Sequence, residues 1–304
     1  MSQAATLTHP SKFSAFKELS KSGIVILVII SVLGGYLIGH PFERPLNVGH
    51  LFLTCLGIFL LGAGCSAFNQ YQERGIDAEM PRTSKRPLPS GRLLPREVMI
   101  FVLVTIFSGL VILSQLNTLL LTLGVCAFIS YNILYTLWWK KHWAFAAIPG
   151  AIPGALPILM GYVASSGEIW TPTGFYLFGI LFFWQMPHFW SLAIKFKNDY
   201  ALGGIPTLPV ARGTEVTVSQ IIIWCLAYIA LALGAPLFMP VGSLYLTVTV
   251  LMSIKILLEL RAFVREPESK RWLHFFLWIN FSLIAFLAAA VADLWSIYLL
   301  HYFK

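Results

Sequence analysis

Long apolar runs are the feature that most limits what this chain can fold into. Nine stretches of about twenty residues each are rich in Leu, Ile, Val, Phe, Ala and Gly, and polar connections separate them. A helix of about twenty residues crosses the hydrocarbon core of a bilayer. Strands of a membrane barrel would be about half that length and would alternate in polarity, unlike these runs. The sequence therefore predicts an all-α, polytopic membrane bundle.

The ends of the apolar runs give the predicted boundaries. Residues 1–22 are expected to form a cytoplasmic N-terminal tail, because the apolar run after them lacks the small-residue cleavage site of a signal peptide. Residues 23–304 are expected to form one nine-helix transmembrane domain. The predicted spans are 23–40, 48–68, 98–115, 118–138, 144–164, 173–194, 216–236, 244–262 and 273–298.

The distribution of charge supports this topology. Charged residues make up only 11% of the chain, against roughly 25% in soluble domains. With the tail in the cytoplasm, 19 of the 21 Lys and Arg residues fall on the cytoplasmic side, which leaves Arg44 and Lys304 outside. This is the positive-inside pattern of membrane proteins. We therefore expect the N-terminus inside and the C-terminus outside, and the net charge of +8 gives no reason to expect a nucleic-acid partner.

Two cytoplasmic connections, 69–97 and 195–215, are longer than a turn requires, and such connections often carry function. In the first, Asn69, Glu73 and Asp77 stand at i, i+4 and i+8. On a helix, their oxygen atoms would share one face, about 6 Å apart along the axis. Hard oxygen ligands of this kind suit Mg²⁺, which takes further oxygens from water and a substrate phosphate.

Basic residues follow these acids directly, at Arg82, Lys85 and Arg86. Forked guanidinium groups match the geometry of phosphate oxygens. Acids for a metal beside bases for a phosphate predict a Mg²⁺-diphosphate site at the cytoplasmic mouth of the bundle. The alternative is a solvated connection of mixed charge, and the spacing of the acids argues against it. Gly75 and Pro81 are the positions at which the motif helix would unwind.

The second connection offers another acid at the same membrane face. Lys195 and Asp199 are again at i and i+4, and a Gly- and Pro-rich turn follows them. Asp199 is expected to meet the first motif across the bundle. Lys195 and Lys197 either bind the diphosphate or are basic only because cytoplasmic loops of membrane proteins are rich in lysine and arginine. Their spacing does not decide between these two roles.

Two further features lie within the predicted spans. His188 is a polar residue at membrane depth and hence a functional candidate, either contacting a metalloporphyrin or moving a proton, or else a hydrogen-bonded histidine of the bundle. Pro187 and the segment 148–157 disturb their helices. They predict either a cavity between helices or close Gly/Ala packing.

These stretches resemble a known family, the UbiA-type intramembrane prenyltransferases, and within it the protohaem IX farnesyltransferase (haem O synthase) branch. The matching segments are NQYQERGIDAEMPRTSKRPLPSG and PHFWSLAIKFKNDYALGGIPTLPVARG, with the nine-span layout around them. The first is similar to the family's Asn-x-x-x-Asp-x-x-x-Asp motif, with Glu73 at the middle acid. The second departs from the wider family's Asp-x-x-x-Asp, because Lys195 replaces the first acid. Haem O synthases share this departure, and it leaves the number of Mg²⁺ ions open.

The resemblance implies a reaction and a set of roles. The reaction is transfer of farnesyl from farnesyl diphosphate to the 2-vinyl group of haem b, with addition of water, to form haem O for terminal oxidases. The setting is a bacterial inner membrane, and an association with a haem A synthase or an oxidase assembly is left open. The implied cofactor is Mg²⁺, bound by Asn69, Glu73, Asp77 and Asp199, which also have catalytic roles together with Lys195; the implied substrate-binding residues are Arg82, Lys85, Arg86, His188, Lys197 and Tyr200.

Two competing readings stay open at this point. A UbiA-type enzyme with an aromatic or quinone-precursor acceptor would use the same metal and diphosphate residues, although the KFKND sequence at 195–199 argues against it. A haem or isoprenoid transporter would also suit a bundle with Gly/Pro-broken helices. A transporter, however, is expected to place polar residues near the midplane, whereas these acids gather at one face.

Overall fold

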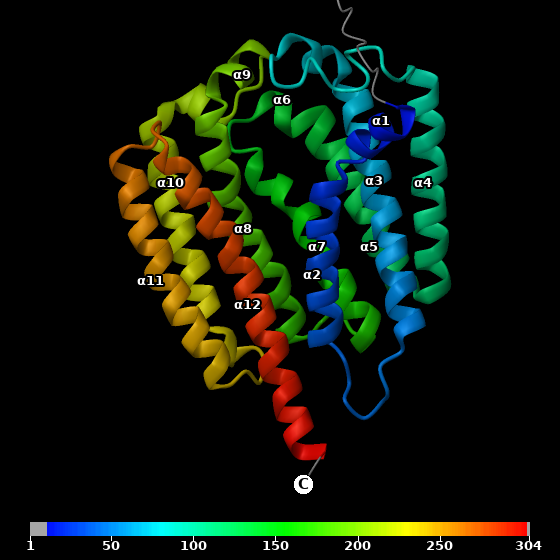
Figure 1. Cartoon of the computed structure of the whole chain (residues 1–304), viewed down its shortest axis with the longest axis vertical. Coiled ribbons are helices and arrows are strands. Elements are labelled where there is room, and N and C mark those ends of the chain that lie inside the picture. The colour runs from blue at the N-terminus through cyan, green and yellow to red at the C-terminus, as the bar shows by residue number, and fades with distance from the viewer. Residues whose placement is uncertain (1–10, 303–304) are drawn as a thin grey trace, which may run out of the picture.

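The computed structural model describes residues 11–302, with side chains described as far as residue 296. Helices and turns make up this part of the chain, and it contains no strand (Figure 1). The first ten residues of the predicted tail, and Lys304, lie outside the described residues. The all-α prediction is therefore confirmed.

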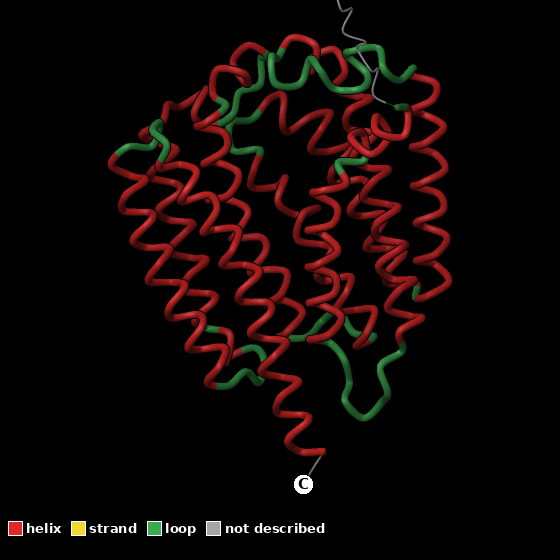
Figure 2. Tube along the Cα trace, in the orientation of Figure 1, coloured by secondary structure: helices red, strands yellow, loops and turns green. Residues whose placement is uncertain are grey.

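Long helices run between the two ends of the bundle, and Figure 2 shows loops gathered at those ends. The helices are α1 (Lys12–Leu19), α2 (Ser22–Ile38), α3 (Val48–Glu79), α4 (Pro95–Leu116), α5 (Thr118–Phe128), the π-helix η1 (Ile129–Trp139), α6 (Lys140–His142), α7 (Ala147–Ser166), α8 (Pro172–Lys195), α9 (Lys197–Leu202), α10 (Leu208–Leu233), the 3₁₀ turn η2 (Ala235–Leu237), α11 (Ser243–Arg265) and α12 (Arg271–Tyr302).

Within the described range, eight helices are long and apolar enough to cross a membrane. The bent pair α1 and α2, which meet at 49°, provides a ninth when it is counted as one span. The protein is therefore a multi-pass membrane protein, and the helices fall where the nine spans were predicted. α1, α6 and α9 lie at one end of the bundle, here called the motif end, and α12 runs to the opposite end (Figure 1).

Small residues let the N-terminal helices approach each other closely. A methyl group at Gly161 of α7 would overlap the carbonyl oxygen of Val32 in α2, and one at Gly35 would overlap the carbonyl oxygen of Ile158. α7 stays helical through Pro153 and Pro157. Within the segment 148–157, methyl groups at Gly150 and Gly154 would overlap the side chains of Tyr135 and Gln185, so close packing is the alternative present at these two glycines.

A π-helix interrupts the regular geometry between α5 and α6. In η1 the Thr136 hydroxyl donates to the carbonyl of Tyr131, five residues back, at 2.8 Å. Stretches of π-helix are rare and frequently lie at functional sites. This one ends at Trp139, directly before Lys140, the first residue of α6, at the motif end of the bundle.

Candidate functional site

The first polar motif is helical rather than a loop. α3 continues through Gly75 and ends at Glu79, just before Met80 and Pro81. The span predicted to end at residue 68 is therefore the apolar part of a longer helix. The motif residues remain helical because one face of this last stretch is buried: Asn69 is 3% exposed, Glu73 4% and Asp77 0%.

Both carboxylates of the first motif form ion pairs in the structure. Lys140 Nζ lies 2.6 Å from Glu73 Oε1. Arg86 Nη1 lies 2.8 Å from Oδ1 and 2.7 Å from Oδ2 of Asp77. These acids are sequestered in cationic surroundings, which is the electrostatic setting of an anion-binding site.

The second connection meets the first through Arg82. Arg82 Nε lies 3.7 Å from Asp199 Oδ2. Its guanidinium also lies over the rings of Phe196, at 4.8 Å from the centroid, and of Tyr200, at 5.8 Å. Asp199 thus lies next to a base of the first motif, and the Tyr200 ring contacts the same Arg82 guanidinium. We call the pairs Glu73–Lys140, Asp77–Arg86 and Asp199–Arg82 the ion-pair cluster.

Sequence reasoning missed Lys21, which joins the motif from the N-terminal segment. Its Nζ donates to Asn69 Oδ1 at 3.2 Å. Burial, followed in importance by the positive charge of Arg86, lowers the pKa of Lys21 to about 8. Lys21 has a left-handed backbone with φ of 48°, the one such non-glycine residue in the described chain. A strained backbone holding a base beside a buried motif is typical of functional positions. In the sequence, the only sign was its place directly before the first span.

Sequence reasoning also missed a polar ladder along η1 and the start of α6. Asn132, Thr136 and Lys140 stand at i, i+4 and i+8, like the motif residues that they face. Asn132 Nδ2 donates to the carbonyl of Cys65 at 2.9 Å, and Asn69 Nδ2 donates to Thr136 Oγ1 at 3.2 Å. The ladder fixes the polar face of α3, and its spacing could have been read from the sequence.

The remaining bases of the first connection are placed differently from one another. The loop turns back on the helix because Thr83 Oγ1 donates to the carbonyl of Asp77 at 2.9 Å. Lys85 is exposed, and only its carbonyl is bound, by Arg92 Nη2 at 2.6 Å. Among the described residues, Lys85 has no ion-pair partner.

The two lysines of the second connection lie outside the ion-pair cluster. Lys195 Nζ is 5.6 Å from the centroid of the Trp272 ring in α12. Lys195 and Lys197 both line a cavity of about 200 Å³. Neither forms an ion pair within the part of the chain that the structure describes.

His188 is held between aromatic rings deep in the bundle. Its ring centroid lies 4.6 Å from that of Trp184 and 4.8 Å from that of Phe276. Asn280 of α12 is a polar neighbour of the imidazole. The Nδ1 atom is buried and has no hydrogen-bond partner among the described residues. The imidazole is therefore only partly satisfied.

The oxygen donors fit Mg²⁺ only together with a phosphate ligand. No three His, Cys, Asp or Glu side chains in the described range are close enough to hold a metal ion by themselves. Mg²⁺ needs only one or two carboxylates when substrate phosphates and waters complete its octahedron. The buried carboxylates of Glu73 and Asp77, with the Asn69 amide oxygen, form a donor set of that kind.

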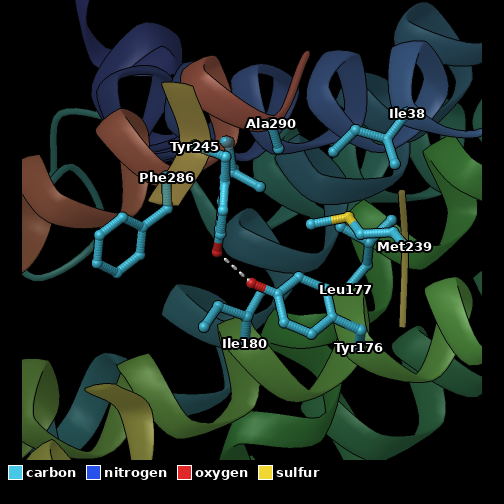
Figure 3. Close-up of a pocket in the computed structure, with 9 residues that line it drawn as sticks. Ile38, Tyr176, Leu177, Ile180, Met239, Tyr245, Phe286 and Ala290 are labelled. Atoms are coloured by element: carbon cyan, nitrogen blue, oxygen red, sulfur yellow. Dashed lines mark hydrogen bonds between the residues drawn. The ribbon is translucent and has the colours of Figure 1, made fainter. Parts of the chain in front are cut away.

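A separate pocket near the opposite end of the bundle is apolar. It is lined by Ile38, Tyr176, Leu177, Ile180, Met239, Tyr245, Phe286, Leu287 and Ala290 (Figure 3). The hydroxyls of Tyr176 and Tyr245 hydrogen-bond to each other at 2.6 Å. It offers no charged group, so the candidate chemistry is confined to the motif end.

Comparison with known proteins extends this picture. The model of the UbiA prenyltransferase family matches residues 28–300. The protoheme IX farnesyltransferase of Bdellovibrio bacteriovorus is 42% identical over 287 residues, covering 94% of this chain and 98% of the relative. A solved digeranylgeranylglyceryl phosphate synthase superposes with a TM-score of 0.75 at 19% identity, over 93% of this chain and 98% of that one. A UbiA homologue from Archaeoglobus fulgidus, solved with DMAPP and Mg²⁺, has a TM-score of 0.64 at 15% identity, over 91% and 99%.

Proposed function

The chain belongs to the UbiA prenyltransferase family, and we propose that it transfers the farnesyl group of farnesyl diphosphate to the 2-vinyl group of haem b, with addition of water, to form haem O. The observation that carries this proposal is the ion-pair cluster, in which the buried carboxylates of Glu73 and Asp77 and the partly buried carboxylate of Asp199 are each paired with a base at one end of an apolar bundle. The names of the relatives supply the acceptor and the donor.

The bases of the cluster bind the diphosphate. Arg82, Arg86 and Lys140 each have a carboxylate partner, and Lys21 donates to a neutral amide. An incoming diphosphate would compete for these cations, and the carboxylates of Glu73 and Asp77 would then be free to hold a divalent metal. When bound, Mg²⁺ neutralises charge on the departing diphosphate. In this exchange, charge-assisted hydrogen bonds to phosphate oxygens take the place of those to carboxylates.

Catalysis is mainly electrostatic in this scheme. The bond between farnesyl C1 and the diphosphate oxygen breaks, and the electron pair leaves with the diphosphate. The vinyl group of haem supplies electrons to C1, and water then adds to the resulting cation and loses a proton. Arg82, Arg86, Lys140 and Lys21 meet the charge that develops on the leaving group, an effect that is usually the largest in such reactions. The surrounding apolar helices exclude water from the allylic carbon.

The other predicted residues also have proposed roles. Asn69, Glu73, Asp77 and Asp199 are the proposed Mg²⁺ ligands, and the Mg²⁺ in the Archaeoglobus relative supports the choice of metal. Tyr200 shapes the position of Arg82. His188 is the proposed haem contact, and Lys85 meets the diphosphate only at the surface.

The proposed setting is the inner membrane of a bacterial cell, with residues 1–22 and both motif connections on the cytoplasmic side. In that orientation, farnesyl diphosphate enters from the cytoplasm and haem from the bilayer. An association with a haem A synthase or an oxidase assembly stays a prediction.

The product identifies the acceptor. Purified protein is incubated with farnesyl diphosphate, Mg²⁺ and either haem b or an aromatic quinone precursor, and the products are analysed by mass spectrometry. We expect haem to gain a farnesyl group plus water. Prenylation of the aromatic acceptor alone would retain the diphosphate site and refute the haem assignment. Unchanged substrates with active transport of haem would favour a carrier.

A further inference from the structure

A polar cavity lies at the motif end, outside the ion-pair cluster. This cavity of about 200 Å³ lies between the α8–α9 junction and the start of α12. It is lined by Ile194, Lys195, Lys197, Asn198, Pro267, Glu268 and Trp272. Cavities that enclose whole ligands measure roughly 300–1,000 Å³, so this one suits part of a larger molecule.

The lining of this cavity favours an anionic group. Two lysines and one acid, Glu268, line it, so the lining has a net positive charge; Glu268 Oε1 accepts a hydrogen bond from Thr214 Oγ1 at 2.9 Å. Lys195 and Lys197 have no carboxylate partner among the described residues. Their ammonium groups are therefore available to a carboxylate or phosphate ligand.

An aromatic wall connects this cavity with the interior of the bundle. Trp272 lies 5.7 Å from Phe276, and Phe276 lies 4.8 Å from His188, measured between ring centroids. Trp184 stacks on the other side of His188 at 4.6 Å. His188 and Lys195 are seven residues apart on α8, so they share a face about 10 Å apart along the axis.

The basic cavity and the aromatic wall together match the anionic edge and the flat aromatic ring of one acceptor, haem. Protohaem IX has two propionate carboxylates at one edge of a flat aromatic ring and its vinyl groups toward the opposite edge. We propose, resting on the function proposed above, that the cavity at Lys195 and Lys197 binds the haem propionates while the porphyrin lies along the aromatic wall toward His188. At the inner end of this wall, His188 has a buried Nδ1 with no hydrogen-bond partner among the described residues, and its ring lies between those of Trp184 and Phe276.

This arrangement gives the two lysines a role distinct from diphosphate binding. The diphosphate already has four bases in and beside the ion-pair cluster, and the cavity lysines contact none of the acids there. Propionates held at the cavity direct the vinyl edge away from it and into the bundle. The acceptor is thereby oriented as well as bound.

Binding of haem b and of its dimethyl ester, which lacks the propionate charges, tests this inference. Each is titrated by absorbance into the full-length wild-type protein, the double variant Lys195→Gln/Lys197→Gln, and the control Lys270→Gln, which changes a nearby exposed lysine outside the cavity. We expect the wild type and the control to prefer haem b by about tenfold or more, and the double variant to lose that preference. The KM for farnesyl diphosphate should stay unchanged in the double variant.

Other outcomes overturn the inference in distinguishable ways. A preference for haem b that persists in the double variant would place the propionates elsewhere. A raised KM for farnesyl diphosphate with unaltered haem binding would assign the lysines to the diphosphate. If the wild type bound neither porphyrin, the haem acceptor of the proposed function would itself fail. Thermal unfolding of the double variant verifies that it is folded.

Discussion

The pair Glu73–Lys140 permits a quantitative prediction. Its atoms are 2.6 Å apart, and the side chains are 4% and 17% exposed. Removing one partner of a fully buried pair costs about 3–5 kcal/mol, because a charge is left without compensation. In Lys140→Met the loss of unfolding free energy should be smaller, about 2–3 kcal/mol. The Lys140 side chain is 17% exposed and so partly hydrated, and Lys21 and Arg86 also attract Glu73. Lys141→Met is the matched control and should cost under about 0.5 kcal/mol.

A double-mutant cycle isolates the interaction itself. Glu73→Gln leaves a lysine that can turn toward water, and we expect a loss of about 1–2 kcal/mol. The double variant Glu73→Gln/Lys140→Met should lose less than the sum of the two single variants, with a coupling energy of about 1–2 kcal/mol. The free energy of unfolding is measured in mixed detergent micelles by circular dichroism. Additive losses, or a Lys140→Met variant as stable as Lys141→Met, would refute the buried pair.

Three further predictions concern other parts of the bundle. Gly161→Ala should destabilise the fold because its methyl group overlaps α2, whereas Gly75→Ala, which meets nothing within 4 Å, should stabilise α3 by up to about 1 kcal/mol; thermal unfolding separates them. Lys21→Met and Lys21→Gly should both raise the KM for farnesyl diphosphate about tenfold, although only the glycine relieves the left-handed backbone, so an unchanged KM in either would remove Lys21 from the site. Arg82→Gln should alter stability by less than about 1 kcal/mol, since its pair with Asp199 is long and partly exposed, yet it should weaken diphosphate binding in a titration.

The all-α fold and the position of the polar motif at one end of the bundle could be predicted from the sequence, because both follow from the order of apolar and polar residues along the chain. Apolar runs of bilayer length allow little but spanning helices. The i, i+4, i+8 spacing of Asn69, Glu73 and Asp77 predicted a shared face, and all three are buried on one helix. Hydropathy alone placed the end of that helix at residue 68, because it registers polarity and not backbone hydrogen bonding.

The partners of the acids were less predictable, because they depend on which helices pack together. Lys140 reaches Glu73 from 67 positions away, and Lys21 reaches Asn69 from 48 away. The π-helix that precedes Lys140 has no clear sequence signal. Lys195 shared its i, i+4 spacing with Asp199, but α8 ends between them and the two side chains have different neighbours.

Metal-dependent binding of a donor analogue tests the central claim most directly. Farnesyl thiodiphosphate is titrated calorimetrically into wild-type protein and Asp77→Asn, each with Mg²⁺ and with EDTA. Asp77→Asn keeps the size of the side chain and one oxygen acceptor for Arg86, so the fold should persist. We predict tight, Mg²⁺-dependent binding to the wild type and a loss of about 10–100-fold or more in the variant. Equal binding by both proteins, or binding indifferent to EDTA, would contradict a metal-diphosphate site at the ion-pair cluster.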